Sequence, residues 1–147
     1  MDDPPIVISR VKSLPDLHEL LSASLVEEQM LVRRTIDDYS SGANRFDRPG
    51  EALFIAAVSG RIVGMCGLNV DPYLADDSVG RVRHLYVLPA CRRRAIGRAL
   101  VAAVMSAARG RFLLLRIRTS NPAANALYAG MGFHRVDDST ATHEKRV

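Results

Sequence analysis

The segment from Gly80 to Arg118 constrains the fold more than any other part of the sequence. Residues 80–87 predict a strand, and Pro89 ends it because proline has no backbone N–H to donate to a sheet. From about Arg94 to Arg109, apolar residues recur at helical spacing on an alanine-rich background. Residues 111–118 then predict a buried strand. Two strands joined through a helix lie parallel in one sheet with a right-handed crossover, so helices must cover the sheet.

Two helices are predicted near the N-terminus. Ser13, Pro15 and Asp16 predict a helix start, because serine caps free amides and proline suits the first turn of a helix. Helical character continues to about Tyr39, with a break predicted near residues 22–24.

A hairpin and a short C-terminal helix complete the prediction. The apolar runs at 53–58 and 61–70 are joined by Ser59 and Gly60, the composition of a tight hairpin turn. The predicted order is strand 6–11, two helices within 13–39, strands 53–58, 61–70 and 80–87, helix 94–109, strand 111–118, helix 121–129 and two short closing strands. This order predicts a single α/β domain of mixed α+β type over residues 1–147, with helices on both faces of one mixed sheet.

Composition narrows the class of protein. A chain of 147 residues with 48% hydrophobic and 24% charged residues fits one globular domain. Its apolar runs are far shorter than the ~20 residues that span a bilayer. Residues 1–5 lack the order of an export signal, so we expect a cytoplasmic protein without a membrane partner. Cys66 and Cys91 form no CxxC motif, so we expect free thiols and no metal site.

Arginines gather where the strand at 80–87 meets the following helix. A helix start presents unpaired N–H groups to anions, arginine adds donors suited to phosphate, and Gly97 allows a ligand to approach the backbone closely. The junction therefore predicts a site for a pyrophosphate-sized anion, with an ordinary arginine-rich surface turn as the alternative. Only 5% of residues are aromatic, so no nucleic-acid surface is expected. The arginines concerned are Arg81, Arg83, Arg92, Arg93, Arg94 and Arg98.

Two motifs in this order resemble the GNAT superfamily of N-acetyltransferases. In that family a strand ending L-x-V precedes R/Q-x-x-G-x-G/A at a helix start, and N-x-x-A-x-x-L-Y-x-x-x-G-F follows later. The matching residues are Leu85, Tyr86 and Val87, then Arg92, Arg93, Arg94, Ala95, Ile96 and Gly97, and finally Asn121, Ala124, Leu127, Tyr128, Gly132 and Phe133. The predicted element order matches the family over nearly the whole chain.

The resemblance implies a role for each of these segments. It implies a sheet that splays between its fourth and fifth strands, with the pantetheine arm of acetyl-CoA bonded to the backbone of Leu85 and Val87. It also implies that Asn121 contacts that arm or caps its helix, and that Tyr128 protonates the leaving sulfur. The expected cofactor-binding residues are Leu85, Tyr86, Val87, Arg92, Arg93, Arg94, Ala95, Ile96, Gly97, Arg98 and Asn121, and the expected catalytic residue is Tyr128.

The chain departs from the family pattern in two respects. Ala95 stands where the family usually has glycine, which is tolerable if the backbone there is already helical. Relatives also carry a glutamate as general base, at the positions that correspond to Arg116 or Arg81 here. This leaves His84, acting through a water, or a water alone as the base. The other interpretation is that His84 is a structural histidine whose ring is hydrogen-bonded within the fold.

The resulting hypothesis is an N-acetyltransferase that transfers the acetyl group of acetyl-CoA to a primary amine by direct attack. The amine is one of a small molecule, a protein N-terminus or a lysine. The alternative is a catalytically silent domain that binds acyl-CoA as a sensor. Acidic residues in the N-terminal helices either attract a cationic acceptor or form a solvated helix face. These acidic residues are Glu27, Glu28, Asp37 and Asp38. A homodimer is compatible with the sequence.

Overall fold

The computed structural model describes residues 3–147, and these form one seven-stranded sheet in the order β1-β2-β3-β4-β5-β7-β6. The predicted order of strands and helices is confirmed, with a short 3₁₀ turn over Pro89–Cys91 added before the third helix. The elements are β1 (Ile6–Arg10), α1 (His18–Val26), α2 (Leu31–Ser41), β2 (Ala52–Val58), β3 (Arg61–Val70), β4 (Val79–Val87), α3 (Ile96–Ala108), β5 (Leu114–Ile117), α4 (Pro122–Gly130), β6 (His134–Arg135) and β7 (His143–Arg146).

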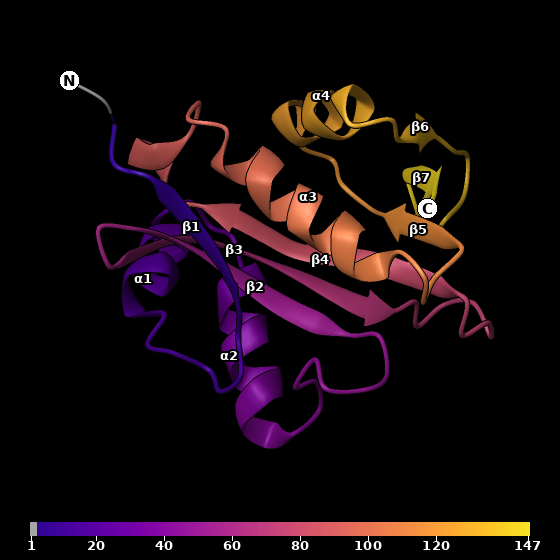
Figure 1. Cartoon of the computed structure of the whole chain (residues 1–147), viewed down its shortest axis with the longest axis horizontal. Helices are drawn as coiled ribbons and strands as arrows, with labels where there is room; N and C mark the ends of the chain where they lie inside the picture. The colour runs from indigo at the N-terminus through magenta and orange to yellow at the C-terminus, as the bar shows by residue number, and fades with distance from the viewer. Residues whose placement is uncertain (1–2) are drawn as a thin grey trace.

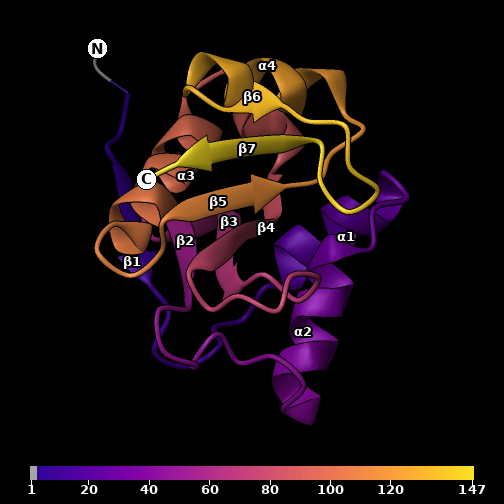
Figure 2. The same cartoon turned by 90° about the vertical axis from the view of Figure 1, so that its right-hand side faces the viewer.

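Helices cover both faces of the sheet, as expected from the crossover. The long helix α3 lies on one face, and α1 and α2 lie on the other (Figures 1 and 2). Leu100, Val101 and Val104 of α3 are fully buried against the sheet, and Leu20 of α1 and Val32 of α2 are buried on the opposite side. No helix within residues 3–147 is long and apolar enough to cross a membrane.

The hairpin between β2 and β3 forms as its turn residues predict. Ser59 and Gly60 both adopt positive φ angles, 50° and 79°. Two successive residues with left-handed backbone angles match the twist of the flanking strands. Short hairpin turns therefore favour glycine and small polar residues at these two positions. Val58 and Arg61 pair directly across the turn.

The predicted start and break of the N-terminal helices are wrong. The first helix starts at His18 instead of after Ser13, and the Asp16 carboxylate accepts the His18 backbone N–H at 2.9 Å. Pro15 disfavours helical backbone at the residue before it, so Ser13 lies too early to cap. The break falls at residues 27–30. Ser24, where the break was predicted, is buried within α1, and its hydroxyl donates to the Leu21 carbonyl of the same helix.

The sheet splays between its two parallel strands. β4 and β5 pair over only three positions, Val79–Leu114, Gly80–Leu115 and Arg81–Arg116. β5 ends at Ile117, whereas β4 continues to Val87. The other six of the nine residues of β4, from Val82 to Val87, therefore pair with no strand on this side, and an unpaired strand edge can bond an extended ligand. This confirms the splay between the fourth and fifth strands that the family resemblance implied.

Candidate functional site

The free edge of β4 presents backbone groups toward the gap. The Leu88 N–H donates to the Val63 carbonyl at 2.9 Å, which makes the neighbouring Gly64–Val87 pair one that does not exchange hydrogen bonds. The N–H and C=O of Val87 therefore point away from β3, toward β5. The Arg92 Nε–H donates to the Val87 carbonyl at 3.1 Å, which leaves the Val87 N–H for another acceptor.

A bulge interrupts β4 just before this edge. The register with β3 shifts between Met65 and Gly67, and His84 adopts a φ of 59°. A bulge bends the strand and increases its local twist. The bulge thus marks the point where β4 turns away from β5.

The turn between β4 and α3, called the arginine turn here after Arg92, Arg93 and Arg94, presents a row of unpaired amides. Arg93 adopts a φ of 67° and Ala95 a φ of 60°, before α3 starts at Ile96. Among residues 3–147, the six backbone N–H groups from residue 93 to residue 98 donate to no acceptor. The first turn of a helix and a nest of successive amides both attract anions. The geometry therefore suits the pyrophosphate-sized anion predicted for this turn.

The four arginines of this turn do not share one environment. Arg92 is paired with Glu27, and Arg94 approaches Asp3 at 3.5 Å. Within the described part of the chain, Arg93 and Arg98 form no ion pair, so their guanidinium groups remain available to an anion. Only two of the four arginines expected to hold pyrophosphate therefore have free side chains.

Gly97 is not required by the packing of α3. A methyl group there would lie 3.5 Å from Leu127 Cδ2 and 4.0 Å from Val87 Cγ2, both ordinary contacts. Close approach by a ligand is a reason for glycine that protein packing does not supply.

Ala95 does not meet the condition under which alanine was tolerable. Its backbone is left-handed, with φ 60° and ψ 18°, not right-handed helical. An alanine in this region costs about 1–2 kcal/mol, partly offset by the higher chain entropy that a glycine loses on folding.

Replacing Ala95 with glycine should therefore stabilise the fold by about 0.5–1 kcal/mol, or about 2–3 °C in Tm. Thermal unfolding measures this shift. Ala102→Gly is the matched control, because Ala102 is exposed in the right-handed interior of α3 and glycine there should destabilise by about 1 kcal/mol. A fall in Tm for Ala95→Gly would show that residue 95 is not strained in solution.

Asn121 caps helix α4, and Tyr128 lies within it. The Asn121 side chain accepts the N–H of Ala123 at 2.9 Å, so its role as a helix cap is confirmed, while its contact with pantetheine stays a prediction. Tyr128 is 4% exposed and packs edge-to-face on Phe133. Burial raises the pKa of Tyr128, so the hydroxyl keeps its proton at physiological pH. Its hydroxyl bonds to no group within residues 3–147.

His84 lies on the α2 face of the sheet at the bulge. Its ring meets Phe46 edge-on, and its buried Nε2 has no hydrogen-bond partner within residues 3–147. The interpretation as a satisfied structural histidine therefore does not hold. Desolvation, followed by the charges of Arg83 and Arg34, lowers the pKa of His84 to about 4. The imidazole is thus neutral near pH 7 but only weakly basic.

Arg81 and Arg116 belong to a buried ionic cluster. The Asp71 carboxylate has no exposed surface, and it pairs with Arg116 at 2.9 Å and with Arg81 at 3.5 Å. Arg116 also contacts Asp138 and Glu144, at 3.1 and 3.0 Å. The two positions where relatives carry a glutamate therefore contribute to packing, and no periodicity in the sequence identified Asp71.

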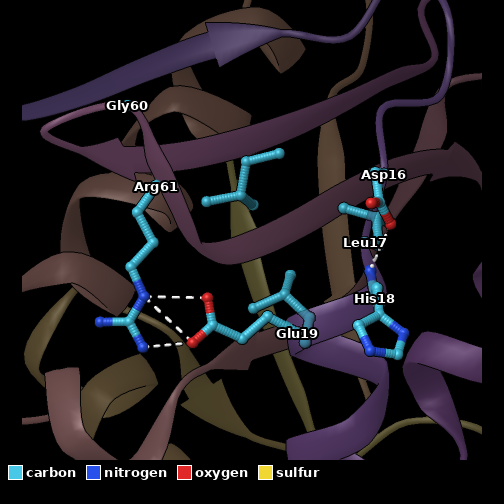
Figure 3. A pocket seen from close by; sticks show the side chains of 8 residues that line it. Asp16, Leu17, His18, Glu19, Gly60 and Arg61 are labelled. Carbon is cyan, nitrogen blue, oxygen red and sulfur yellow. Dashed lines mark hydrogen bonds and ion pairs between the residues drawn. The ribbon is translucent and has the colours of Figure 1, made fainter.

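Two cavities lie outside these segments; the expected cofactor-binding residues and Tyr128 line neither, whereas Arg83 and Asp38 line the second. One, of about 280 Å³, lies between the start of α1 and the β2–β3 turn, beside an Arg61–Glu19 ion pair (Figure 3). The other, of about 270 Å³, lies between the α2–β2 loop and Arg83. The expected cofactor-binding residues 85–87 and 92–98 instead lie at the end of β4, in the arginine turn and in the first turn of α3, whereas Asn121 and Tyr128 belong to α4.

Comparisons with known proteins show which proteins the chain is similar to. The model of the acetyltransferase (GNAT) family matches residues 14–133. The chain is 36% identical over 85 residues to the N-alpha-acetyltransferase RimI of Mycobacterium tuberculosis, a match that covers 55% of this chain and 51% of that relative. It is 32% identical over 107 residues to an aminoglycoside N(6')-acetyltransferase type 1 of Klebsiella aerogenes, which covers 69% of each.

A similar solved structure is that of a protein assigned as an acetyltransferase, from Exiguobacterium sp. 255-15. Its TM-score is 0.88 at 30% identity, and the match covers 97% of this chain and 93% of that one. The chain spans about half the length of RimI but nearly all of this structure. The splayed sheet is thus similar to that of a solved protein over almost the whole chain.

Proposed function

Because this chain belongs to the GNAT family of acetyltransferases, we propose that it transfers an acetyl group from acetyl-CoA to a primary amine by direct attack. The family is one of acetyl-CoA-dependent acyltransferases. We propose the class of acceptor, the direct attack of the amine on the thioester and the residues that take part. One observation carries it: six unpaired amides at the start of α3 lie beside the open edge of β4. Unpaired amides at a helix start suit a phosphate group, and an open strand edge suits an extended amide chain.

The residues fit acetyl-CoA, which supplies an activated thioester. The amides of residues 93–98, with the free side chains of Arg93 and Arg98, would hold the pyrophosphate. The backbone of Leu85 and Val87 would bond the pantetheine arm as a neighbouring strand does. The Val87 N–H would stabilise negative charge on the acetyl oxygen.

Tyr128 and a water would move the protons. Burial raises the pKa of Tyr128, so its hydroxyl is protonated and could donate to the sulfur as negative charge develops there while the C–S bond breaks. Solvent would return the proton to Tyr128 before the next turnover. The low basicity of His84 argues against it as the general base, so the amine would lose its first proton to solvent before attack, and an ordered water would only relay to solvent the proton released after attack. An alkylammonium ion is too weak an acid to protonate a group with a pKa of about 4.

The alternative, a silent acyl-CoA sensor, is favoured by one observation. Arg81 and Arg116 occupy the positions of the family's usual bases, and both are committed to Asp71. A sensor would share the cofactor site but would release no thiol when amines are supplied.

Saturating CoA should stabilise the parent protein by about 2.7 kcal/mol at 100 times its Kd, which thermal unfolding measures as an increase in Tm. Dephospho-CoA and ATP should give smaller shifts. The same protein should then release free thiol from acetyl-CoA in a screen of aminoglycosides, polyamines, amino acids and peptides with free N-termini. An unchanged Tm at millimolar CoA would refute cofactor binding, whereas a shift without thiol release across the screen would favour the sensor.

A further inference from the structure

Glu27 connects three segments of the structure. Its carboxylate accepts the Tyr86 hydroxyl at 2.7 Å and receives both terminal nitrogens of Arg92, at 2.8 and 2.7 Å. Tyr86 lies in β4, Arg92 lies in the arginine turn, and Glu27 ends α1. A two-point arginine–carboxylate bond fixes relative orientation as well as distance.

The contact is built to hold one geometry. The Arg92 guanidinium lies 5.5 Å from the centre of the Tyr86 ring, over its face, and its Nε–H reaches the Val87 carbonyl. Bonding to Arg92, and then to Tyr86, lowers the pKa of Glu27, so the carboxylate stays charged. The Arg92 cation also offsets a negative charge placed at the C-terminal, negative end of α1.

These contacts change the role expected of Arg92. Its two terminal nitrogens both bond to Glu27, and its Nε–H bonds to the Val87 carbonyl in the strand whose edge borders the gap. Glu27 stays partly exposed, but its carboxylate is bonded to Arg92 and Tyr86, and its lowered pKa makes it a poor general base.

We propose that Glu27 is a positioning residue for cofactor binding, resting on the proposed function. Through Arg92 and Tyr86 it holds the end of β4 and the arginine turn in one relative geometry. Pantetheine would lie against the first segment and pyrophosphate against the second. A cofactor that spans both gains affinity when their spacing is fixed in advance.

The direction in which Glu27→Gln changes the affinity for CoA separates this positioning role from a simple electrostatic effect. CoA is a polyanion, and removing a nearby negative charge should on charge alone strengthen its binding. Freeing Arg92 to reach a phosphate would act in the same direction. The positioning role predicts the opposite, because the turn and the strand end would lose their fixed spacing.

The test is titration calorimetry of CoA into the parent protein and its Glu27→Gln variant. We expect Glu27→Gln to weaken CoA binding about 10-fold and to raise KM for acetyl-CoA with kcat little changed. Arg92→Lys, which keeps the charge but loses the two-point fork, should weaken binding similarly. The double variant Glu27→Gln/Arg92→Lys should be no weaker than the single ones, since all three lose the same contact.

Glu28→Gln is the matched control, because Glu28 is exposed and makes no ion pair within residues 3–147. It carries the same charge change one residue away, and it should leave CoA affinity unchanged or slightly stronger. Equal or tighter CoA binding by Glu27→Gln, in a parent that binds CoA, would overturn the positioning role alone. A parent that binds no CoA would overturn the proposed function as well.

Discussion

Asp71→Ala is expected to destabilise the fold by about 3–5 kcal/mol, the usual cost of leaving buried charge without its partner. The carboxylate has no exposed surface and is shared by two guanidinium groups. Without it, Arg81 keeps a bond to the Thr140 carbonyl and its place over the Tyr73 ring. Arg116 keeps Asp138, Glu144 and the Thr140 hydroxyl. Unfolding in urea, with an unchanged m-value, measures the loss.

Two further variants show whether burial is the cause. Asp138→Asn removes a different carboxylate from Arg116, but one that is 45% exposed, and it should cost much less. Adding Arg81→Met to Asp71→Ala removes one of the unpaired charges and should restore part of the stability. A loss below about 1 kcal/mol for Asp71→Ala would show that both arginines find water or other partners.

Tyr128→Phe is expected to lower kcat by about 100-fold on a good acceptor, with CoA affinity nearly unchanged. The substitution removes only the hydroxyl and keeps the ring packed on Phe133 and His143. That hydroxyl bonds to no group within residues 3–147, so the free energy of unfolding should not fall. Steady-state kinetics that follow thiol release, together with thermal unfolding, measure both quantities.

Tyr73→Phe is the control for hydroxyl deletion, since Tyr73 is exposed in the β3–β4 loop, and its kcat should equal that of the parent. A Tyr128→Phe variant as active as the parent would remove this hydroxyl from the mechanism. A loss of only about 10-fold would still support proton donation, because a thiolate is already a fair leaving group.

The sequence by itself determined the order of elements, and its prediction that the cofactor binds at β4 and the arginine turn stays a prediction. Periodicity and turn residues act locally, so the Ser59-Gly60 hairpin and the Asn121 cap were predicted and are confirmed. The parallel pairing of β4 with β5 followed from the crossover rule. The two motifs led to the family, which the family model and the relatives confirm.

Side-chain partners were decided only by the tertiary structure. Glu27 and Arg92 are 65 residues apart, and Asp71 and Arg116 are 45 apart, so no local pattern links either pair. The left-handed backbone of Ala95 was also invisible, because alanine gives no sign of a positive φ. Charge and periodicity show that arginines gather near a helix start, but only three-dimensional packing shows which of them are already neutralised. Ion pairing depends on distances of a few ångström, and these are set by how α1, β4 and β5 pack together.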